Sequence, residues 1–218
     1  MKQKTLFIVA AVILLLAFLI GTLVYKSEKV DQSAQLAERN RASLVRMHSP
    51  TLGKPDAPVV IVEFFDPACE TCREFYPLVK KMMAANPERI RLVLRYAPFH
   101  KGSDKVVAVL EAARKQGKFW PALEALFASQ ADWSPHHAPQ VDLVWRNLEG
   151  LGLNPEQMRA DMAAPEIARV IAQDLDDART LNVTKTPEYF VNGKPLPSFG
   201  YEQLKRLVDD ALNEGQQR

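Results

Sequence analysis

The chain has 218 residues, of which 47% are hydrophobic and 25% charged, so it is long enough for one compact domain with its own core and for a membrane segment besides. Its formal net charge of +2 is uneven: residues 1–54 carry eight Lys or Arg against three acidic residues, and the remainder carries 20 against 23. The main part of the chain is therefore slightly acidic, which gives no reason to expect a nucleic-acid partner.

An uncharged apolar run from Thr5 to Tyr25 begins after Lys4 and ends before Lys26. About 20 apolar residues are enough to cross a bilayer as a helix. We therefore predict an uncleaved transmembrane anchor over residues 1–25. The alternative is a cleaved signal peptide, although the apolar region of a signal peptide is usually about 7–15 residues long and ends in a small-x-small site. Both interpretations export the rest of the chain.

The segment that follows, residues 26–57, is polar and ends in a stretch that contains Pro50, Gly53 and Pro55. Proline and glycine interrupt regular structure, so this segment is predicted to be a linker that holds the domain away from the membrane. A solvated tether is the simpler form of that linker. A short helix between Val30 and Val45 that associates with copies of itself is the alternative.

The first core elements form a β-α-β unit. Residues 59–65 are apolar, β-branched and aromatic and are closed by an Asp-Pro pair, which predicts a buried strand. Apolar residues then fall on one helical face from Cys69 to about Ala85, and residues 90–96 alternate as a second strand, with Arg95 on the face opposite to the leucines. This order places Cys69 at the carboxyl end of the first strand, where open α/β sheets carry their functional groups.

The rest of the domain is predicted to be a helical region followed by a hairpin and a last helix. Residues from about 100 to 181 are largely helical in pattern, with helices over 103–115, 120–127 and 141–148 and further ones starting near 154 and 165. A strand over 188–191, an Asn-Gly turn, a partner strand over 194–196 and a helix from Tyr201 to about Asn213 complete the domain, and residues 214–218 are a tail.

Cys69 and Cys72 are the only cysteines in the chain, and they lie two residues apart between the predicted strand and helix. A helix N-terminus stabilises an anion, so the Cys69 pKa should fall below the ordinary value of about 8.5. Cys69 is the predicted nucleophile, and Cys72, one turn further into the helix, is the predicted resolving thiol. A C-x-x-C pair in this position is typical of thioredoxin-like redox sites.

The two cysteines could also form a structural disulfide, a zinc site or a Cu(I) site. A structural disulfide is disfavoured because a two-residue loop adds little constraint to the unfolded chain. A zinc site would need further ligands, and the sequence holds no second cysteine pair. A Cu(I) site for a copper-handling protein is the alternative from a different functional class, because soft thiolates favour Cu(I), but no additional Met or His ligand lies near the pair in sequence.

Three features together resemble the DsbA-like thiol:disulfide oxidoreductases of the thioredoxin superfamily. They are the C-x-x-C motif after Glu63-Phe64-Phe65, the Thr186-Pro187 pair followed by Glu188-Tyr189-Phe190-Val191-Asn192-Gly193, and the long helical stretch between them. The resemblance implies an α/β, thioredoxin-like fold over residues 58–213, with an inserted helical domain over about residues 100–181. A transmembrane helix and a linker would precede this domain.

The resemblance also implies roles for individual residues. Glu63 corresponds to a buried acid that moves protons to and from the inner cysteine; a structural ion pair with a lysine is the alternative for this residue. The Thr186–Pro187 bond is expected to be cis, in a loop that holds the substrate peptide by strand-like pairing. Glu70 and Thr71 replace the histidine-containing pair of strongly oxidising members, so Glu70 is expected to raise the Cys69 pKa and make the protein a milder oxidant.

These features predict a thiol:disulfide oxidoreductase that needs no cofactor or metal and acts on exported protein thiols or disulfides through Cys69 and Cys72. The direction of exchange stays open. A DsbB-like membrane partner would recharge an oxidase, and a DsbD-like partner would supply a reductase or isomerase. Because disulfides persist outside the cytosol, we expect a single-pass protein of the bacterial inner membrane with its catalytic domain in the periplasm.

Overall fold

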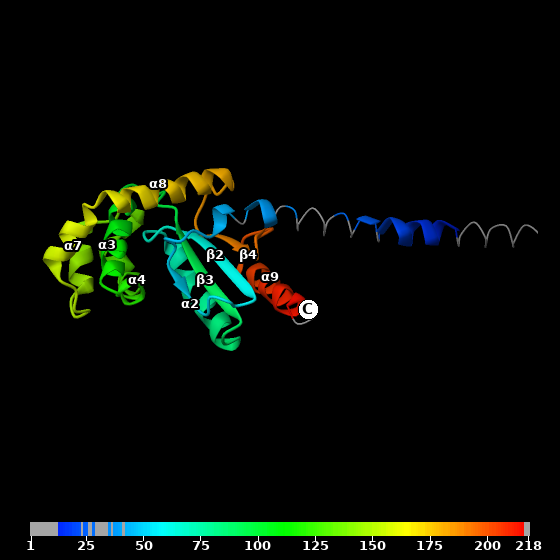
Figure 1. Ribbon diagram of the computed structural model, residues 1–218, viewed down its shortest axis with the longest axis horizontal. Helices are drawn as coiled ribbons and strands as arrows, with labels where there is room; N and C mark the ends of the chain where they lie inside the picture. The colour runs from blue at the N-terminus through cyan, green and yellow to red at the C-terminus, as the bar shows by residue number, and fades with distance from the viewer. Residues whose placement is uncertain are drawn as a thin grey trace, which may run out of the picture.

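The computed structural model describes residues 13–22, 24–25, 28, 35, 37–40 and 42–215 (Figure 1). Its centre is one five-stranded sheet with the strand order β1-β3-β2-β4-β5. The β2 and β3 strands run parallel, and every other neighbouring pair is antiparallel. The strands are β1 Thr51–Leu52, β2 Val59–Phe65, β3 Ile90–Tyr96, β4 Glu188–Val191 and β5 Lys194–Pro195. The predicted bounds of the three longer strands are confirmed, and β5 is one residue shorter than predicted.

Helices cover both faces of the sheet (Figure 1). Alternate residues of β2, such as Ile61 and Phe65, pack into the core on the side of α2 Glu70–Ala85 and α9 Tyr201–Glu214. Val62 and Phe64 point to the other face and pack against the end of α8 Pro165–Thr180. Because β2 is buried on both faces, its sequence is an almost continuous apolar run, and a charged residue within it stands out.

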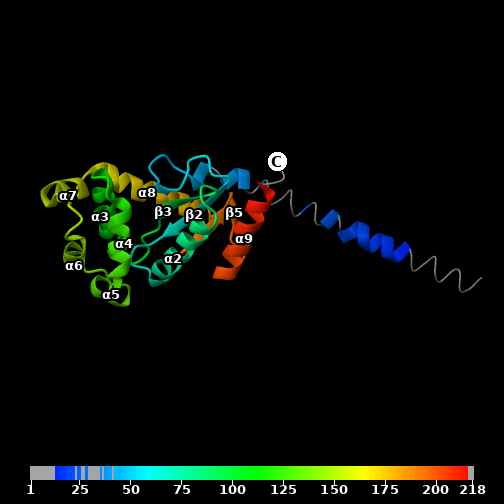
Figure 2. The ribbon, with the colours of Figure 1, turned by 90° about the horizontal axis from the view of Figure 1, so that it is seen from below.

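In the helical region between β3 and β4, the helices from α3 Ser103–Lys115 to α7 Pro155–Met162 lie at one end of the sheet, away from α9, and α8 runs back over the sheet (Figure 2). A single 3₁₀ turn, Trp145–Leu148, replaces the second half of the helix predicted over 141–148. The region otherwise follows the prediction, with a short additional helix before a 3₁₀ turn at Pro135–His137. Its helices are α3 Ser103–Lys115, α4 Phe119–Ala128, α5 Gln130–Trp133, α6 Val141–Val144, α7 Pro155–Met162 and α8.

The end of the predicted linker belongs to the folded unit, which corrects the boundary placed at residue 58. Leu44 is only 2% exposed and packs against the outer face of the sheet with Val62 and Phe64. The β1 strand, also within residues 26–57, pairs with β3. Ser43, Arg46 and His48 of this segment contact the domain through polar groups, so their sequence resembles that of a solvated tether.

The ionic contacts centre on Arg95 in β3, whose side chain is fully buried. Its Nη2 atom donates to Asp174 Oδ1 at 2.7 Å and to Asp177 Oδ2 at 2.6 Å, both on α8, and its Nη1 atom donates to the Ser43 carbonyl. Arg46 donates to Asp177 through two nitrogens at 2.8 and 2.6 Å. The network therefore joins three stretches of chain: residues 43–46, the central strand β3 and α8.

The predicted anchor lies partly outside the described residues. Residues 13–22 are helical, and their large apolar side chains are exposed, as Leu14 is at 71%. Among the residues that the structure describes, no helix has both the length and the apolar character needed to cross a membrane. The prediction for residues 1–12, and hence for a span over residues 1–25, lies outside that part of the chain.

Candidate active site

The turn between β2 and α2 places Cys69 at the start of the helix. Asp66, which is fully buried, accepts a hydrogen bond from the Ala68 N–H through Oδ1 at 2.8 Å, and its carbonyl accepts from the Cys69 N–H at 3.0 Å. Cys69 is the N-cap of α2, with φ −79° and ψ 121°. Short Asp side chains commonly close such turns. The Asp-Pro pair marked the end of the strand in the sequence, but it did not indicate that Asp66 shapes the site.

Asp66 also fixes the neighbouring loop. Its Oδ2 atom accepts from the His100 N–H at 2.8 Å and lies 2.8 Å from His100 Nδ1. The imidazole of His100 stacks on that of His137, with ring centroids 4.8 Å apart. Within the described part of the chain, no group of three or more His, Cys, Asp or Glu could hold a metal ion.

Cys69 is 5% exposed, and its sulfur lies 3.3 Å from the Thr186 carbonyl oxygen. The Cys72 thiol, which donates a hydrogen bond to the Cys69 sulfur, is the main cause that lowers the pKa of Cys69 to about 5. Burial opposes this shift, while Thr186 and the backbone N–H groups of Cys72 and Thr71 add to it. The predicted decrease in the pKa of Cys69 is thus present in the structure, and Cys69 is a thiolate at neutral pH.

Cys72 has the opposite character. It is fully buried, and burial raises the pKa of its thiol well above the ordinary value; the hydrogen bond to Cys69 and the charge of Glu63 raise it further. One sulfur of the pair is therefore an anion, on a residue with a small exposed area, and the other is a protonated thiol on a residue with none. This asymmetry fits a nucleophile at Cys69 and a resolving thiol at Cys72.

Glu63 lies in the middle of β2 and is 2% exposed. Burial raises the pKa of its carboxyl to about 8; the Tyr189 hydroxyl lowers this pKa in part, and the charge of Cys69 raises it. No lysine or arginine of the described residues forms an ion pair with Glu63, so the structural ion pair considered from the sequence finds no partner. A buried carboxyl with a pKa near neutrality is suited to exchange protons.

The loop before β4 lies against the two cysteines. The Thr186–Pro187 bond is cis, as predicted, and the Thr186 carbonyl is the group that contacts the Cys69 sulfur. Pro187 is buried, whereas Glu188 is half-buried, which raises the pKa of its carboxyl. The structure therefore brings Cys69, Cys72, Glu63 and the Thr186–Pro187 loop together from β2, α2 and the approach to β4.

Glu70 and Thr71 lie between the cysteines in the first turn of α2. The Thr71 N–H is one of the groups that lower the pKa of Cys69. The Glu70 side chain is exposed and is not among the main causes of that shift. Solvent screens an exposed charge strongly, so the backbone N–H groups and the Cys72 thiol outweigh the repulsion predicted from Glu70.

Gln130 is a buried residue of α5 that the sequence did not indicate. Its Nε2 atom donates to the Pro67 carbonyl at 2.8 Å and to the Cys69 carbonyl at 3.0 Å. These two carbonyls flank the turn that carries Cys69. The side chain thus links the helical region directly to the cysteine turn, from a position 61 residues further along the chain. Only the folded structure reveals such a contact, because a single glutamine has no local sequence signal.

Replacing Gln130 by leucine should destabilise the protein by about 2 kcal/mol, because the Pro67 and Cys69 carbonyls each lose a buried donor, although the Cys69 carbonyl keeps the Arg73 N–H. Urea unfolding of the full chain would measure this change. Gln157 is the matched control: it is exposed on α7, and its side-chain amide donates to the Asp161 side chain, so Gln157→Leu should change stability by less than about 0.5 kcal/mol. Equal effects of the two variants would contradict the linking role of Gln130.

The ultraviolet absorbance of the Cys69 thiolate should titrate with a midpoint near pH 5 in the reduced protein, and not near the ordinary value of about 8.5. Cys72 should stay protonated through this range, because its pKa is raised. The titration should therefore show one thiolate, and it should disappear in Cys69→Ser while Glu70→Gln moves the midpoint only slightly. A midpoint above 7 would mean that the Cys72 thiol and the backbone N–H groups do not stabilise the anion.

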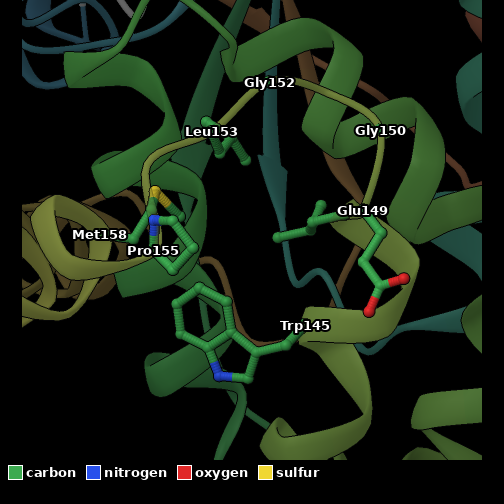
Figure 3. Close-up of a pocket in the computed structure, with 8 residues that line it drawn as sticks. Trp145, Glu149, Gly150, Gly152, Leu153, Pro155 and Met158 are labelled. Atoms are coloured by element: carbon green, nitrogen blue, oxygen red, sulfur yellow. The ribbon is translucent and has the colours of Figure 1, made fainter.

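A separate pocket lies in the helical region, well apart in sequence from the cysteines (Figure 3). Its lining is mainly apolar and includes Trp145, Leu153 and Met158. No residue of the predicted site contributes to it. The pocket therefore has no part in the arrangement of the two thiols.

Comparison with known proteins places this geometry in a family. A family model described as thioredoxin matches residues 46–210. A thioredoxin-like oxidoreductase from Silicibacter pomeroyi DSS-3 has 35% sequence identity and a TM-score of 0.69, and the match covers 79% of this chain and 98% of that one. Alpha-DsbA1 of Wolbachia pipientis has a TM-score of 0.70 over 80% of this chain and 96% of its own, with 18% identity, which shows the fold alone.

Curated relatives fall into two groups of different length. The probable disulfide bond formation protein D of Bacillus anthracis is 28% identical over 229 residues, covering 98% of this chain and 100% of that protein. The Na(+)/H(+) antiporter NhaA 3 of Salinispora tropica is 34% identical over 145 residues, and the chain spans only 21% of the antiporter's length. The thioredoxin model covers more than half of the chain, including the Cys69–Cys72 pair and the Pro187 loop, so the chain belongs to the thioredoxin family and has its mixed α/β fold.

Proposed function

We propose that the protein is a thiol:disulfide oxidoreductase that exchanges disulfides with exported proteins through Cys69 and Cys72. The observation that supports this most strongly is the pairing of a Cys69 thiolate, with its pKa lowered to about 5, with a buried, protonated Cys72 thiol. In the oxidising direction a substrate thiolate attacks Cys69 of the disulfide form, and Cys72 leaves with the electron pair. A second substrate thiolate then displaces Cys69, which leaves the substrate oxidised and the protein reduced.

The oxidising direction is supported by the charge at Cys69. Above about pH 5 the dithiol form carries a stabilised thiolate, whereas the disulfide form carries no charge at sulfur. A stabilised reduced form makes the disulfide form a better oxidant, as the low thiol pKa of strongly oxidising members of this class illustrates. The name of the Bacillus anthracis relative, disulfide bond formation protein D, points the same way. In this direction a DsbB-like membrane partner would restore the disulfide; a DsbD-like donor would serve the reverse direction.

We further propose that the protein acts in the periplasm, tethered to the bacterial inner membrane by one span over residues 1–25. The uncharged run from Thr5 to Tyr25 supports this arrangement. Membrane fractionation combined with N-terminal sequencing of the mature protein tests it. Retention of residues 1–25 in the membrane fraction is expected, whereas a soluble protein that begins near residue 26 would show a cleaved signal peptide.

The reduction potential of the Cys69–Cys72 pair tests the direction of exchange. Equilibration of the full chain with glutathione buffers should give a value between about −270 mV, typical of thioredoxin, and about −120 mV, typical of the strongest oxidants of this class. Acid quenching and alkylation of free thiols would measure the reduced fraction. A potential at or below that of thioredoxin would contradict an oxidising role and favour the reductase direction.

A further inference from the structure

Tyr189 carries a buried hydroxyl at a position where packing needs only an aromatic ring. It lies directly opposite Glu63 in the antiparallel β2–β4 pairing. Residues opposite each other in such a pair project from the same face with Cβ atoms about 4.5–5.5 Å apart. Tyr189 is fully buried, and its ring stacks on Phe75 of α2 at a centroid distance of 6.0 Å. A phenylalanine would make the same ring contact.

The Tyr189 hydroxyl and one oxygen of the Glu63 carboxyl are buried. Among the described residues, neither Tyr189 Oη nor Glu63 Oε2 makes a hydrogen bond of ordinary geometry. A buried hydroxyl without a partner destabilises a protein. As opposite partners in the strand pair, Glu63 and Tyr189 project from the same face of the sheet, and Tyr189 packs there in one cluster with Cys72 of α2. The Tyr189 hydroxyl is therefore unfavourable for packing alone, and its position opposite Glu63 suggests that it acts on that carboxyl.

The electrostatics of Glu63 indicate what the hydroxyl does. The titratable groups that face its carboxyl are Cys69, Cys72 and Tyr76 from α2 and Tyr189 from β4. Burial raises the pKa of Glu63, and Tyr189 is the neighbour that lowers it. A hydroxyl that donates to the carboxylate stabilises the ionised form. At neutral pH it therefore increases the fraction of Glu63 that can accept a proton.

We propose that Tyr189 is a positioning residue for proton transfer at Cys72. When Glu63 is ionised, the Tyr189 hydroxyl turns to donate to its carboxylate and holds it ready to take the thiol proton. This role rests on the proposed function. When a mixed disulfide at Cys69 is resolved, the Cys72 proton passes to Glu63, and the Cys72 thiolate attacks the Cys69 sulfur. The bond between Cys69 and the substrate sulfur breaks, and that sulfur leaves with the electron pair. In the reverse direction, Glu63 returns the proton to Cys72, and Tyr189 keeps its own proton throughout.

The variant Tyr189→Phe, which removes only the hydroxyl, tests this role. The test measures two steps separately: formation of a mixed disulfide at Cys69 and its resolution by Cys72. Reduced full-chain protein is mixed with oxidised glutathione at several pH values, quenched with acid and analysed by mass spectrometry. Formation of the Cys69–glutathione adduct should proceed at the wild-type rate. Its resolution by Cys72 should slow at pH 7 by roughly three- to tenfold, the effect of half to one unit in the pKa of Glu63. The difference should vanish at a pH where Glu63 is ionised in both proteins.

Two comparisons make the result specific to Tyr189. In a Glu63→Gln background, Tyr189→Phe should have no further effect on resolution, because its target carboxylate is gone. Tyr96→Phe is the matched control: it also removes a fully buried hydroxyl beside a glutamate, Glu111, and should leave the pH profile of resolution unchanged. If Tyr189→Phe slowed resolution by the same factor at every pH, or slowed it as much in the Glu63→Gln background, the proposed role of Tyr189 would be wrong. A wild-type protein that forms no adduct would overturn the proposed function and this role with it.

Discussion

Replacing Cys72 by serine should convert the protein into a trap for its substrates. The Cys69 thiolate remains able to attack a disulfide, but no second thiol is present to release the adduct, so mixed disulfides should accumulate. The serine is close in size to cysteine, and Cys72 is fully buried, so the fold should persist. Non-reducing electrophoresis of the full chain, expressed where it is exported, would show adducts that dithiothreitol removes.

The matched variant is Cys69→Ser, which should form no adducts and should lose exchange activity to the level of the uncatalysed reaction. The difference follows from the two sulfurs themselves. Cys69 lies beside the Thr186 carbonyl with a pKa lowered to about 5, whereas the pKa of the Cys72 thiol is raised by burial. Equal trapping by both variants would mean that either sulfur can reach a substrate, and the assignment of nucleophile and resolving thiol would be wrong.

Replacing Asp174 by alanine should destabilise the fold by about 3–5 kcal/mol, the range observed when one partner of a buried ion pair is removed. Asp174 Oδ1 accepts from Arg95 Nη2 at 2.7 Å and lies 2.6 Å from His48 Nε2, and its Oδ2 atom accepts from the Tyr96 N–H at 2.7 Å. The variant leaves a fully buried guanidinium with one carboxylate in place of two. Urea unfolding of the full chain would measure the loss.

Asp176→Ala is the control for this prediction. Asp176 lies on the same helix and pairs with Arg179, but both side chains are exposed, so the change should alter stability by less than about 1 kcal/mol. A double variant, Asp174→Leu with Arg95→Met, should recover part of the loss, because it removes the uncompensated charge. If Asp174→Ala destabilised no more than Asp176→Ala, the network would not hold the segment before β1 to the domain.

Acid should weaken the same network. Burial alone would raise the pKa of Asp177, but the Arg46 and Arg95 guanidinium groups hold it below its ordinary value. A carboxyl with a lowered pKa stabilises the fold above its unfolded pKa, and this contribution is lost as the pH falls through the folded value. The stability contributed by Asp177 should therefore be full at neutral pH and decline in acid.

The sequence predicted those parts of the fold that depend on local patterns. The apolar run of β2 and the alternation in β3 define strands at the observed bounds. The C-x-x-C pair and the Thr186–Pro187 pair are short motifs, and the structure places both at one site. Glu63 was identified because a lone charge in an otherwise apolar strand needs an explanation.

The burial of Arg95 could not be predicted from a local pattern. Arg95 alternates with leucines in β3, so the pattern placed it on the other face of the sheet, but the pattern contains no information about what covers that face. In the structure, α8 supplies two aspartates and residues 43–46 close the cluster, so Arg95 is fully buried. Gln130 was missed for the same reason: its partners are backbone carbonyls distant in sequence.

If Cys69 and Cys72 pass a disulfide to or from a substrate, the oxidised full chain should oxidise a reduced dithiol peptide and become reduced itself. The most direct test mixes the oxidised full chain with an equal amount of a reduced peptide that contains two cysteines, and follows both by mass spectrometry. The peptide should lose two hydrogen atoms and the protein should gain two, while Cys69→Ser transfers nothing. A peptide that stays reduced, or that is oxidised equally in the presence of Cys69→Ser, would contradict the account.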